Sequence, residues 1–394
     1  MFYLKLITNV LLSLQILYLP VVVYFIGSPS TSVSLSLSVF IVLLIVIQVI
    51  FGNIQPRVSK LILLYIFLIF LFSLIILTSY YNSNMDLLNS GKLNGYIINI
   101  ILPLTIIFFM SLFKVFSYSV FPKASFLLGI LAIIANFHFI FTQQFTLSSR
   151  IFFIEDNPIS TGRIFGMHFL IGMYLWRLSN KKIYILFIIL LDLFFVFMSG
   201  SRQVLVAMVI TSIITLFLNN YFQLTYKKII NHFLSLIFLS FIFLMTFKLF
   251  RSTFLYTRLN NVGFESLGRN QLIENSIKLT FTDIKTFFFG IGFGSYYSKS
   301  LDGFFYPHNL LLEIQVEIGL IGLMTFMLIF FVVARYIKKS LLLNKNVLSF
   351  YSIIFLYSLI ISMFSFNING NSHVFIFGFL ILHEYIQNRR LSNV

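Results

Sequence analysis

A histidine and an asparagine stand directly before a long apolar run in the C-terminal quarter of the chain. His308-Asn309 is followed by nine residues and then by Gly319-Leu320-Ile321-Gly322. An imidazole titrates near neutral pH and can take a proton from a hydroxyl group, as a general base must. Taken alone, His308 is equally well interpreted as an interfacial histidine that caps the helix.

The spacing to the two glycines gives the histidine a predicted setting. If residues 308–322 form one helix, offsets of 11 and 14 residues place Gly319 and Gly322 on the face of His308, three and four turns deeper. Small residues let a neighbouring helix approach closely, and Pro307 suits the first turn. We therefore expect an imidazole at a membrane surface, on a helix that packs tightly below it.

Arginines form a second group of candidate site residues. Arg202 follows Ser199-Gly200-Ser201, at a predicted outer helix mouth where the charge rule expects no basic residue. The guanidinium group is suited to bidentate phosphate binding, so arginines near an outer surface fit a lipid pyrophosphate. Further arginines in predicted outer segments are Arg150, Arg163, Arg251, Arg258 and Arg269. The alternative is ordinary surface arginine, paired with Glu265, Glu274 or Asp302.

Other ionisable residues receive structural interpretations. Glu313 and Glu317 lie one turn apart and roughly opposite His308, so we expect an ion pair with a neighbour, with an arginine as one candidate. Asp192 receives the same interpretation, and His138 and His168 are expected to be satisfied by hydrogen bonds. No carboxylate pair or histidine cluster has a convincing metal-ligand spacing, so neither a metal nor a cofactor is predicted.

The composition defines the elements that must hold these residues. The 394 residues are 59% hydrophobic and 10% charged, with a mean hydropathy of +0.99, far from the composition of a soluble domain. The net charge of +16 is explained by basic cytoplasmic loops rather than by nucleic-acid binding. The sequence thus predicts an all-α polytopic membrane protein that forms a single integral membrane domain, 1–394.

Apolar runs long enough to cross a bilayer recur along the whole chain. About twelve spans are predicted, at 5–27, 35–52, 61–79, 97–114, 125–142, 163–178, 183–198, 203–220, 233–249, 310–334, 347–367 and 374–388. Lys and Arg gather in alternate loops, which places both termini in the cytoplasm and the candidate site outside the bacterial inner membrane. No internal repeat of the kind common in transporters is found.

One outer segment, 250–309, is far longer than the others, and loops of this length are usually functional. Within it an amphipathic stretch is predicted to lie along the outer interface. Its apolar residues are Leu272, Ile273, Ile277, Phe281, Ile284 and Phe288, opposite Glu274, Asn275, Lys278 and Lys285. A turn at Gly290-Ile291-Gly292-Phe293-Gly294 is predicted to end it.

These motifs together resemble the O-antigen ligase and O-antigen polymerase superfamily. The resemblance rests on Ser201-Arg202, Gly268-Arg269, the turn at 290–294 and His308-Asn309 with Gly319 and Gly322. Arg150 with Asn157-Pro158 resembles an earlier outer arginine segment of the family. The resemblance covers 185–335, flanked by N-terminal helices in 1–184 and C-terminal helices in 336–394.

The resemblance implies a GT-C-like, metal-independent, inverting glycosyltransferase that uses an undecaprenyl-pyrophosphate-linked glycan. His308 then acts as the base, and Arg202 and Arg269 hold the pyrophosphate. Arg150, Arg163, Arg258 and Asn309 are implied to bind substrate, while Gly319, Gly322 and Glu317 are structural. The implied partners are a glycan or lipid A-core acceptor, membrane lipids and a chain-length regulator protein.

Three functions stay open on the sequence. A polymerase of O-antigen or capsular repeats is favoured by the Phe- and Ile-rich composition, and a ligase that transfers the finished chain to lipid A-core or protein carries the same motif. A transporter or flippase for the same lipid-linked sugar is the competing class. It predicts buried charges along a central path, whereas the predicted charges here lie at the outer rim.

Overall fold

The computed structural model describes residues 2–26, 30–52, 58–83, 87–142, 158–178, 183–220, 267–300, 306–343 and 348–391. Every regular element in these ranges is helical. The elements are α1 (Phe2–Leu17), α2 (Leu19–Ile26), α3 (Ser30–Gly52), α4 (Lys60–Tyr81), α5 (Leu87–Tyr96), the π-helix η1 (Ile97–Ile101), α6 (Leu102–Leu112), α7 (Val120–Thr142), α8 (Pro158–Leu178), α9 (Ile183–Ser199), α10 (Arg202–Asn220), α13 (Leu267–Thr280), α14 (Ile284–Phe289), α15 (Tyr296–Lys299), α16 (Leu310–Leu343), α17 (Phe350–Ser362) and α18 (Ser372–Leu391).

The helices agree with the prediction of a multi-pass membrane protein. Within the described ranges, five helices are long and apolar enough to cross a bilayer, or six if α1 and α2 form one bent span. Helices occupy each predicted span that falls in these ranges, and 233–249 lies outside them. The total of twelve spans therefore stays a prediction.

The first predicted span, 5–27, is occupied by two helices, α1 and α2, rather than by one. The chain turns by 89° between α1 and α2, just before Pro20. Proline has no amide hydrogen for the carbonyl oxygen four residues earlier, which is that of Ile16. His373 of α18 takes the place of this donor, with its Nε2 atom 2.9 Å from the Ile16 oxygen.

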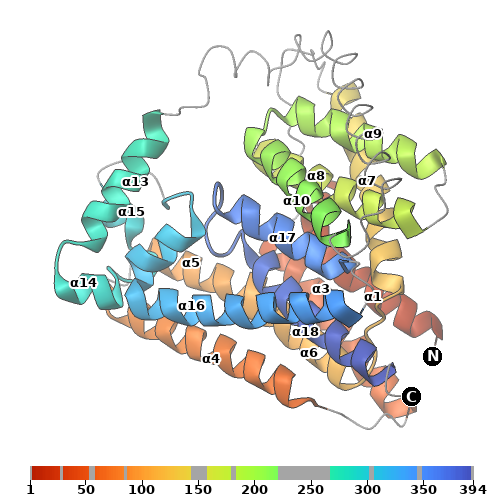
Figure 1. The fold of residues 1–394 in the computed structure, drawn as a ribbon, viewed down its shortest axis with the longest axis horizontal. Helices are drawn as coiled ribbons and strands as arrows, with labels where there is room; N and C mark the ends of the chain where they lie inside the picture. The colour runs from red at the N-terminus through yellow and green to blue at the C-terminus, as the bar shows by residue number, and fades with distance from the viewer. Residues whose placement is uncertain are drawn as a thin grey trace.

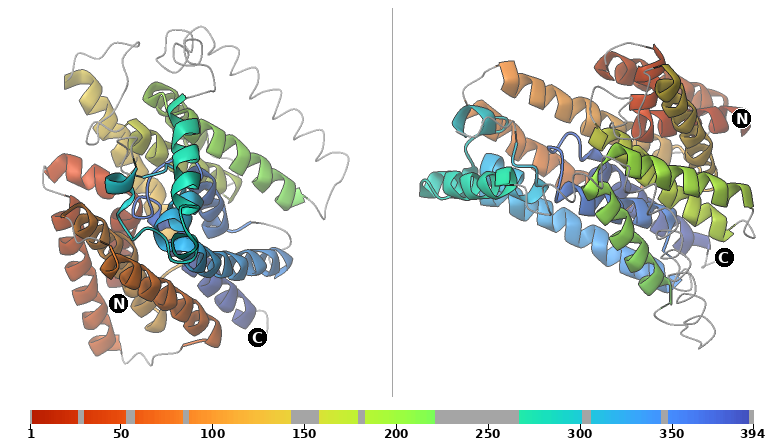
Figure 2. Two further views of the ribbon diagram at one scale, coloured as in Figure 1. Left: turned by 90° about the vertical axis from the view of Figure 1, so that its left-hand side faces the viewer. Right: turned by 90° about the horizontal axis from the view of Figure 1, so that it is seen from above.

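The helices form one bundle with two distinct ends. Both termini lie at one end, and α13, α14 and α15 lie at the opposite end (Figure 1). Helix α16 runs beside α4 and packs against α18. Helix α17 packs against α18 and also against α8 and α10. Figure 2 shows the bundle from two further directions.

Within the long segment predicted to lie outside, residues 267–300 contain the helices α13, α14 and α15, and α13 and α14 pack onto α16. Helix α13 buries Leu272 against Ile291, Tyr296 and Val316, so Leu272 does not share the exposure of the other apolar residues of the predicted stretch. Those residues, Ile273, Ile277, Phe281, Ile284 and Phe288, are exposed. The stretch is also not one helix, because Asp283 starts α14 by accepting a hydrogen bond from the amide of Thr286 at 2.6 Å.

Candidate functional site

His308 lies immediately before α16, at the end of the bundle that carries α13–α15. Its backbone is left-handed, with φ 56°, a conformation that is uncommon for a residue with a side chain and that clusters at functional sites. Its ring lies 4.4 Å from the ring of Tyr306, measured between centroids, at an angle of 53°. The expectation that Pro307 and His308 belong to the helix is wrong, since the helix begins at Leu310.

Asn309 explains where the helix begins. Its Oδ1 atom accepts hydrogen bonds from the amides of Leu311 at 3.0 Å and Leu312 at 3.1 Å, as an N-cap residue does. Its Nδ2 atom donates to the carbonyl oxygen of Met363 at 3.1 Å. Asn309, implied by resemblance to bind substrate, thus ties the residue after His308 to the loop that follows α17.

Gly319 breaks α16 rather than lying on a continuous helical face. Its φ is 78° and its ψ is −175°, so the predicted alignment of His308 with Gly319 and Gly322 on one face is wrong. A β-carbon at Gly319 would lie 2.3 Å from the carbonyl oxygen of Phe288 and 2.5 Å from the amide nitrogen of Gly290. Gly319 is therefore needed for the close approach of the end of α14 and of the turn that follows it.

Gly322 has a different neighbour from the one expected. A β-carbon there would meet the Cγ2 atom of Ile318 at 2.5 Å, and Ile318 belongs to the same helix. The absence of a side chain at Gly322 thus accommodates the break of α16 itself.

The predicted turn at Gly290–Gly294 is confirmed. It supplies amide donors to carbonyl groups that the break of α16 at Gly319 leaves without partners in the helix. The carbonyl groups at a helix end lack intrahelical donors. Here the amide of Ile291 donates to the oxygen of Val316 at 2.8 Å, and the amide of Gly292 donates to the oxygen of Glu317 at 3.1 Å. Gly290, Gly292 and Gly294 all have positive φ, which glycine adopts without steric cost.

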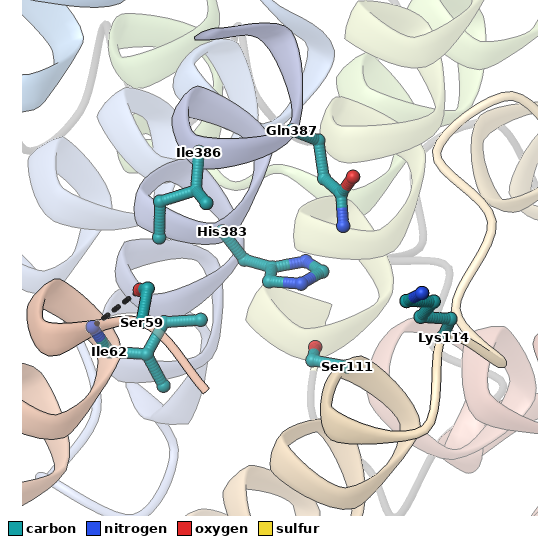
Figure 3. A pocket seen from close by; sticks show the side chains of 7 residues that line it. All are labelled: Ser59, Ile62, Ser111, Lys114, His383, Ile386 and Gln387. Carbon is teal, nitrogen blue, oxygen red and sulfur yellow. Dashed lines mark hydrogen bonds between the residues drawn. The ribbon is translucent and has the colours of Figure 1, made fainter. Parts of the chain in front are cut away.

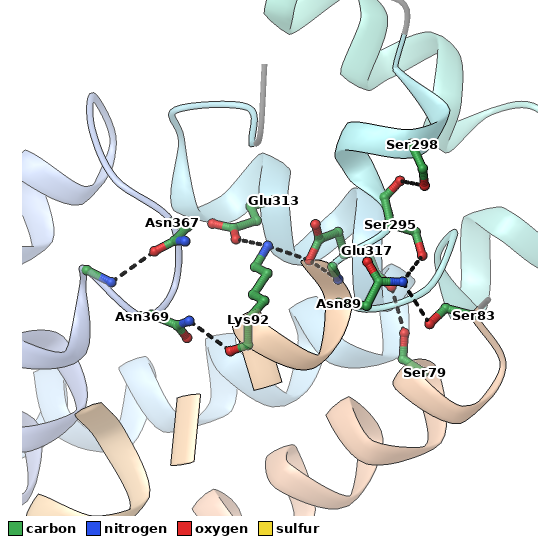
Figure 4. Close-up of polar contacts among 12 residues, drawn as sticks. Ser79, Ser83, Asn89, Lys92, Ser295, Ser298, Glu313, Glu317, Asn367 and Asn369 are labelled. Atoms are coloured by element: carbon green, nitrogen blue, oxygen red, sulfur yellow. Dashed lines mark hydrogen bonds and ion pairs between the residues drawn. The ribbon is translucent and has the colours of Figure 1, made fainter. Parts of the chain in front are cut away.

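The two glutamates of α16 share one buried lysine. Lys92 of α5 forms ion pairs with Glu313 and with Glu317, the latter at 2.7 Å, and all three side chains are at least nine-tenths buried (Figure 4). The Oε2 atom of Glu317 also accepts from the amide of Gly294 at 3.0 Å. The prediction of a structural ion pair is confirmed, with a lysine as the partner.

This ion cluster lies close to the histidine. Burial raises the pKa of the Tyr306 hydroxyl, and the negative charge of Glu313 adds to that rise. Tyr306 in turn contacts the His308 ring. Tyr306 thus contacts the candidate base and senses the charge of Glu313, the residue of the cluster nearest to His308 in sequence.

Arg163 of α8 is buried within the protein and organises the loop between α17 and α18. Its guanidinium donates to the carbonyl oxygen of Gly370 at 2.7 Å and to Oδ1 of Asn371 at 3.2 Å. The ring of Phe366 lies 5.1 Å from its central carbon, and Phe366 has a left-handed backbone, with φ 64°. This setting supports a structural role for Arg163 rather than the substrate contact implied by resemblance.

Residues 363–371 thereby connect several parts of the site. Besides Arg163 and Asn309, the loop reaches α5, where Nδ2 of Asn369 donates to the carbonyl oxygen of Lys92 at 2.8 Å. Neither this loop nor Lys92 was predicted from the sequence to belong to the site. The signal in the sequence is the run Asn367-Ile368-Asn369-Gly370-Asn371, a polar segment between two strongly apolar helices.

The other predicted arginines are placed to different degrees. Arg202 is the first residue of α10 and is partly buried. It follows a turn at Gly200, with φ 65°, that packs onto α8 where a β-carbon at Gly162 would meet Oγ of Ser199 at 2.6 Å. Arg269 lies in α13, and nothing is described of its side chain. Arg150, Arg251 and Arg258 lie outside the described residues.

The other histidines among the described residues have structural partners. His168 pairs with Asp192 at 2.8 Å, and both are fully buried; His138 is hydrogen-bonded to the Tyr24 hydroxyl at 2.8 Å. At the opposite end of the bundle from His308, His383 lines a small hollow with Ser111 and Lys114 (Figure 3). His383 is hydrogen-bonded to Tyr118 there. The contacts of His168 with Asp192 and of His138 with Tyr24 confirm the structural interpretations of His138, His168 and Asp192.

Comparison with known proteins gives one positive finding. Residues 185–327, somewhat more than a third of the chain, match the family model described as O-antigen ligase. No curated protein matches the chain. The matched range contains Arg202, Arg269, the Gly290 turn, His308 and both glutamates of the ion cluster. The match over residues 185–327 supports a relationship of this multi-pass membrane protein to the O-antigen ligase and polymerase superfamily.

Proposed function

We propose that the protein transfers a glycan from undecaprenyl pyrophosphate to a hydroxyl group outside the inner membrane, and that it polymerises O-antigen or capsular repeat units. The observation that carries this proposal is the position of His308. It stands at the helix-bundle end away from the termini, with a left-handed backbone, inside the range that matches the O-antigen ligase family.

The proposed reaction is a single displacement. His308 takes the proton of the acceptor hydroxyl as that oxygen bonds to the anomeric carbon of the donor sugar. The bond from this carbon to the pyrophosphate oxygen breaks, and its electron pair leaves with the lipid pyrophosphate. Attack from the face opposite the leaving group inverts the anomeric centre.

Arginines are proposed to stabilise the leaving group, without a metal ion. Arg202 and Arg269 offset the charge that develops on the pyrophosphate, and Arg150 and Arg258 extend this binding region. Support comes from the match over 185–327, which includes Arg202 and Arg269. Arg163 is instead proposed to hold the loop at 363–371, because its buried guanidinium donates to Gly370 and Asn371 and lies over the ring of Phe366.

A ligase that moves the finished chain to lipid A-core or to protein is the second candidate. The description of the matching family as O-antigen ligase favours it. A flippase is disfavoured by two sets of buried ionisable groups that pair with each other, His168 with Asp192 and Lys92 with its glutamates.

Substitutions at His308 that respect its backbone test the proposed base. Asparagine and glycine both tolerate positive φ, so His308→Asn and His308→Gly remove the imidazole without adding strain. Loss of a general base typically lowers the rate about 100- to 10,000-fold. We expect polysaccharide assembly to fall by such a factor while the protein accumulates in the membrane as before. Full activity in both variants removes His308 from the chemistry.

Deletion followed by gel analysis of the glycans distinguishes the activities. A single repeat attached to its acceptor, with no long ladder, identifies a polymerase. Lipid-linked polymer without attachment identifies a ligase. Single lipid-linked units that stay on the cytoplasmic side identify a flippase and refute the proposed reaction.

A further inference from the structure

A groove of about 450 Å³ runs between α4 and the continuous helix formed by α5, η1 and α6. One end is formed by Leu77 and Leu93, and the other end reaches Phe108 and Phe109. On α4 the lining extends from Tyr65 to Leu77, and twelve helical steps correspond to about 18 Å. The groove therefore covers more than half of a hydrocarbon core about 30 Å thick.

The walls of the groove offer contacts to apolar groups alone. The few hydroxyl groups that line it already have hydrogen-bond partners within the protein. Those of Ser73 and Tyr96 share a bond of 2.9 Å, and the Tyr65 hydroxyl donates to the carbonyl oxygen of Phe375 at 2.6 Å. A ligand that fills the groove thus has to be a hydrocarbon, because a polar ligand would lose its hydration without compensation.

The groove is open along its length to the surroundings of the bundle. Phe70 and Ile97, which line it on opposite sides, are 58% and 45% exposed. The wall on the side of Ile97 contains the π-helix Ile97–Ile101, and π-helical turns in α-helices are frequent at functional sites. A chain that lies in the bilayer can enter sideways.

The outer end of the groove adjoins the candidate site. Leu93 directly follows Lys92, whose ammonium pairs with Glu313 and Glu317 of α16. Leu77 lies two residues before Ser79, which donates to the carbonyl oxygen of Glu317 at 2.7 Å. Figure 4 shows these residues of α4, α5 and α16 together. Glu313 lies five residues after His308 in the sequence. A lipid whose hydrocarbon chain lies in the groove therefore has its head group near the candidate base.

We propose that this groove binds the hydrocarbon chain of the lipid-linked glycan donor. The inference rests on the proposed function, since that function supplies a donor with a long hydrocarbon chain. The groove fixes the depth and direction of the chain, and so presents the pyrophosphate end at the mouth beside Tyr306 and His308. Ordinary bilayer phospholipid is the competing occupant.

A groove-filling substitution with a matched control tests the proposal. Leu77→Trp fills the outer end of the groove, while Leu74→Trp places the same ring on α4 outside it; the two leucines are 36% and 42% exposed. Each purified variant is assayed with two donors that carry the same glycan on a long polyisoprenyl or a short prenyl pyrophosphate.

We expect Leu77→Trp to raise the KM for the long-chain donor at least about tenfold, because lost burial of two methylene groups suffices for that factor. The KM for the short-chain donor should stay unchanged, and Leu74→Trp should behave as the unsubstituted protein. Equal effects of Leu77→Trp on both donors, or on neither, overturn the proposal. If the unsubstituted protein transfers from neither donor, the proposed function itself fails.

Photo-crosslinking decides the occupant without turnover. A diazirine-labelled long-chain polyisoprenyl pyrophosphate should label peptides from 65–77 and 93–109. Excess unlabelled polyisoprenyl pyrophosphate should abolish this labelling, and phosphatidylglycerol should not. Equal competition by phosphatidylglycerol assigns the groove to bulk lipid and overturns the proposal.

Discussion

Gly319 and Gly290 lie so close that a β-carbon placed on Gly319 meets the amide nitrogen of Gly290 at 2.5 Å. Both have positive φ, 78° and 77° respectively. The break in α16 and the turn of the outer segment therefore depend on each other. This pair connects the two glycine motifs of the sequence, at 290–294 and 319–322, into one backbone contact.

Substitution of Gly319 tests this contact. Gly319→Ala combines a left-handed backbone, which costs about 1–3 kcal/mol for a residue with a β-carbon, with a clash against backbone that cannot move away. We expect a loss of more than about 2 kcal/mol in the free energy of unfolding, and loss of transfer activity, measured by thermal unfolding and by assay in detergent.

Gly91→Ala is the matched control for this prediction. A β-carbon at Gly91 in α5 has no atom within 4 Å, and alanine is a better helix former than glycine. Unchanged or slightly raised stability is expected. Equal destabilisation by the two substitutions would contradict the specific contact between Gly319 and Gly290.

Removal of the buried lysine should be costly. Lys92→Met leaves Glu313 and Glu317 without their cation, and an uncompensated buried charge typically costs about 3–5 kcal/mol. Thermal unfolding should show this loss, and a triple variant that adds Glu313→Gln and Glu317→Gln should recover most of it. Failure of the triple variant to recover would mean that packing of the lysine, rather than its charge, matters.

The exposed pair formed by Lys278 and Glu274 provides the comparison. These residues lie 2.7 Å apart on α13 and are mostly exposed. Exposed pairs on a helix contribute little stability because solvent screens them. Lys278→Met should leave the unfolding temperature unchanged within error, whereas a shift as large as that of Lys92→Met would contradict the role assigned to burial.

Asn309 has two functions that different substitutions separate. Asn309→Ala removes both the cap of α16 and the bond to Met363, and loss of an N-cap costs about 1 kcal/mol. Asn309→Asp keeps the oxygen acceptor for the amides of Leu311 and Leu312 but cannot donate to Met363. We expect the aspartate variant to keep the stability of the helix and to lose activity, because the loop no longer fixes the residue after His308.

The two measurements decide between cap and tether. Thermal unfolding reports the cap, and the transfer rate reports the position of His308. If Asn309→Asp is as active as the unsubstituted protein, the bond to Met363 does not contribute to the site.

Arg163 and Arg202 should respond differently to the same change. Arg163→Gln leaves the oxygens of Gly370 and Asn371 without their donor, so its main effect should be a loss of stability, about 1–3 kcal/mol for buried polar groups left unpaired. Arg202→Gln should lower the transfer rate with little change in unfolding temperature. The reverse pattern would exchange the roles proposed for these two arginines.

The sequence by itself determined the features that depend on neighbours along the chain. Apolar runs of bilayer length predicted the helices, and three alternating glycines predicted the turn at 290–294. The order His308-Asn309 before an apolar run predicted the start of α16 to within two residues. Each of these signals is local, because helix length, backbone freedom and capping depend on residues a few positions apart.

Only the tertiary structure decided how these local elements meet. At Gly319, the turn that begins at Gly290, remote in sequence, lies against the backbone of α16. Its amides bind the carbonyl groups of Val316 and Glu317, which a continuous helix would use for its own hydrogen bonds. Lys92 is the partner of the α16 glutamates because α5 packs beside α16, and nothing near Lys92 in sequence records that pairing. His308 likewise has a left-handed backbone directly before a cap residue that is hydrogen-bonded to the loop at Met363. Ion pairs, backbone strain and close approach depend on atoms that folding brings together, so composition and spacing could predict their participants but not their geometry.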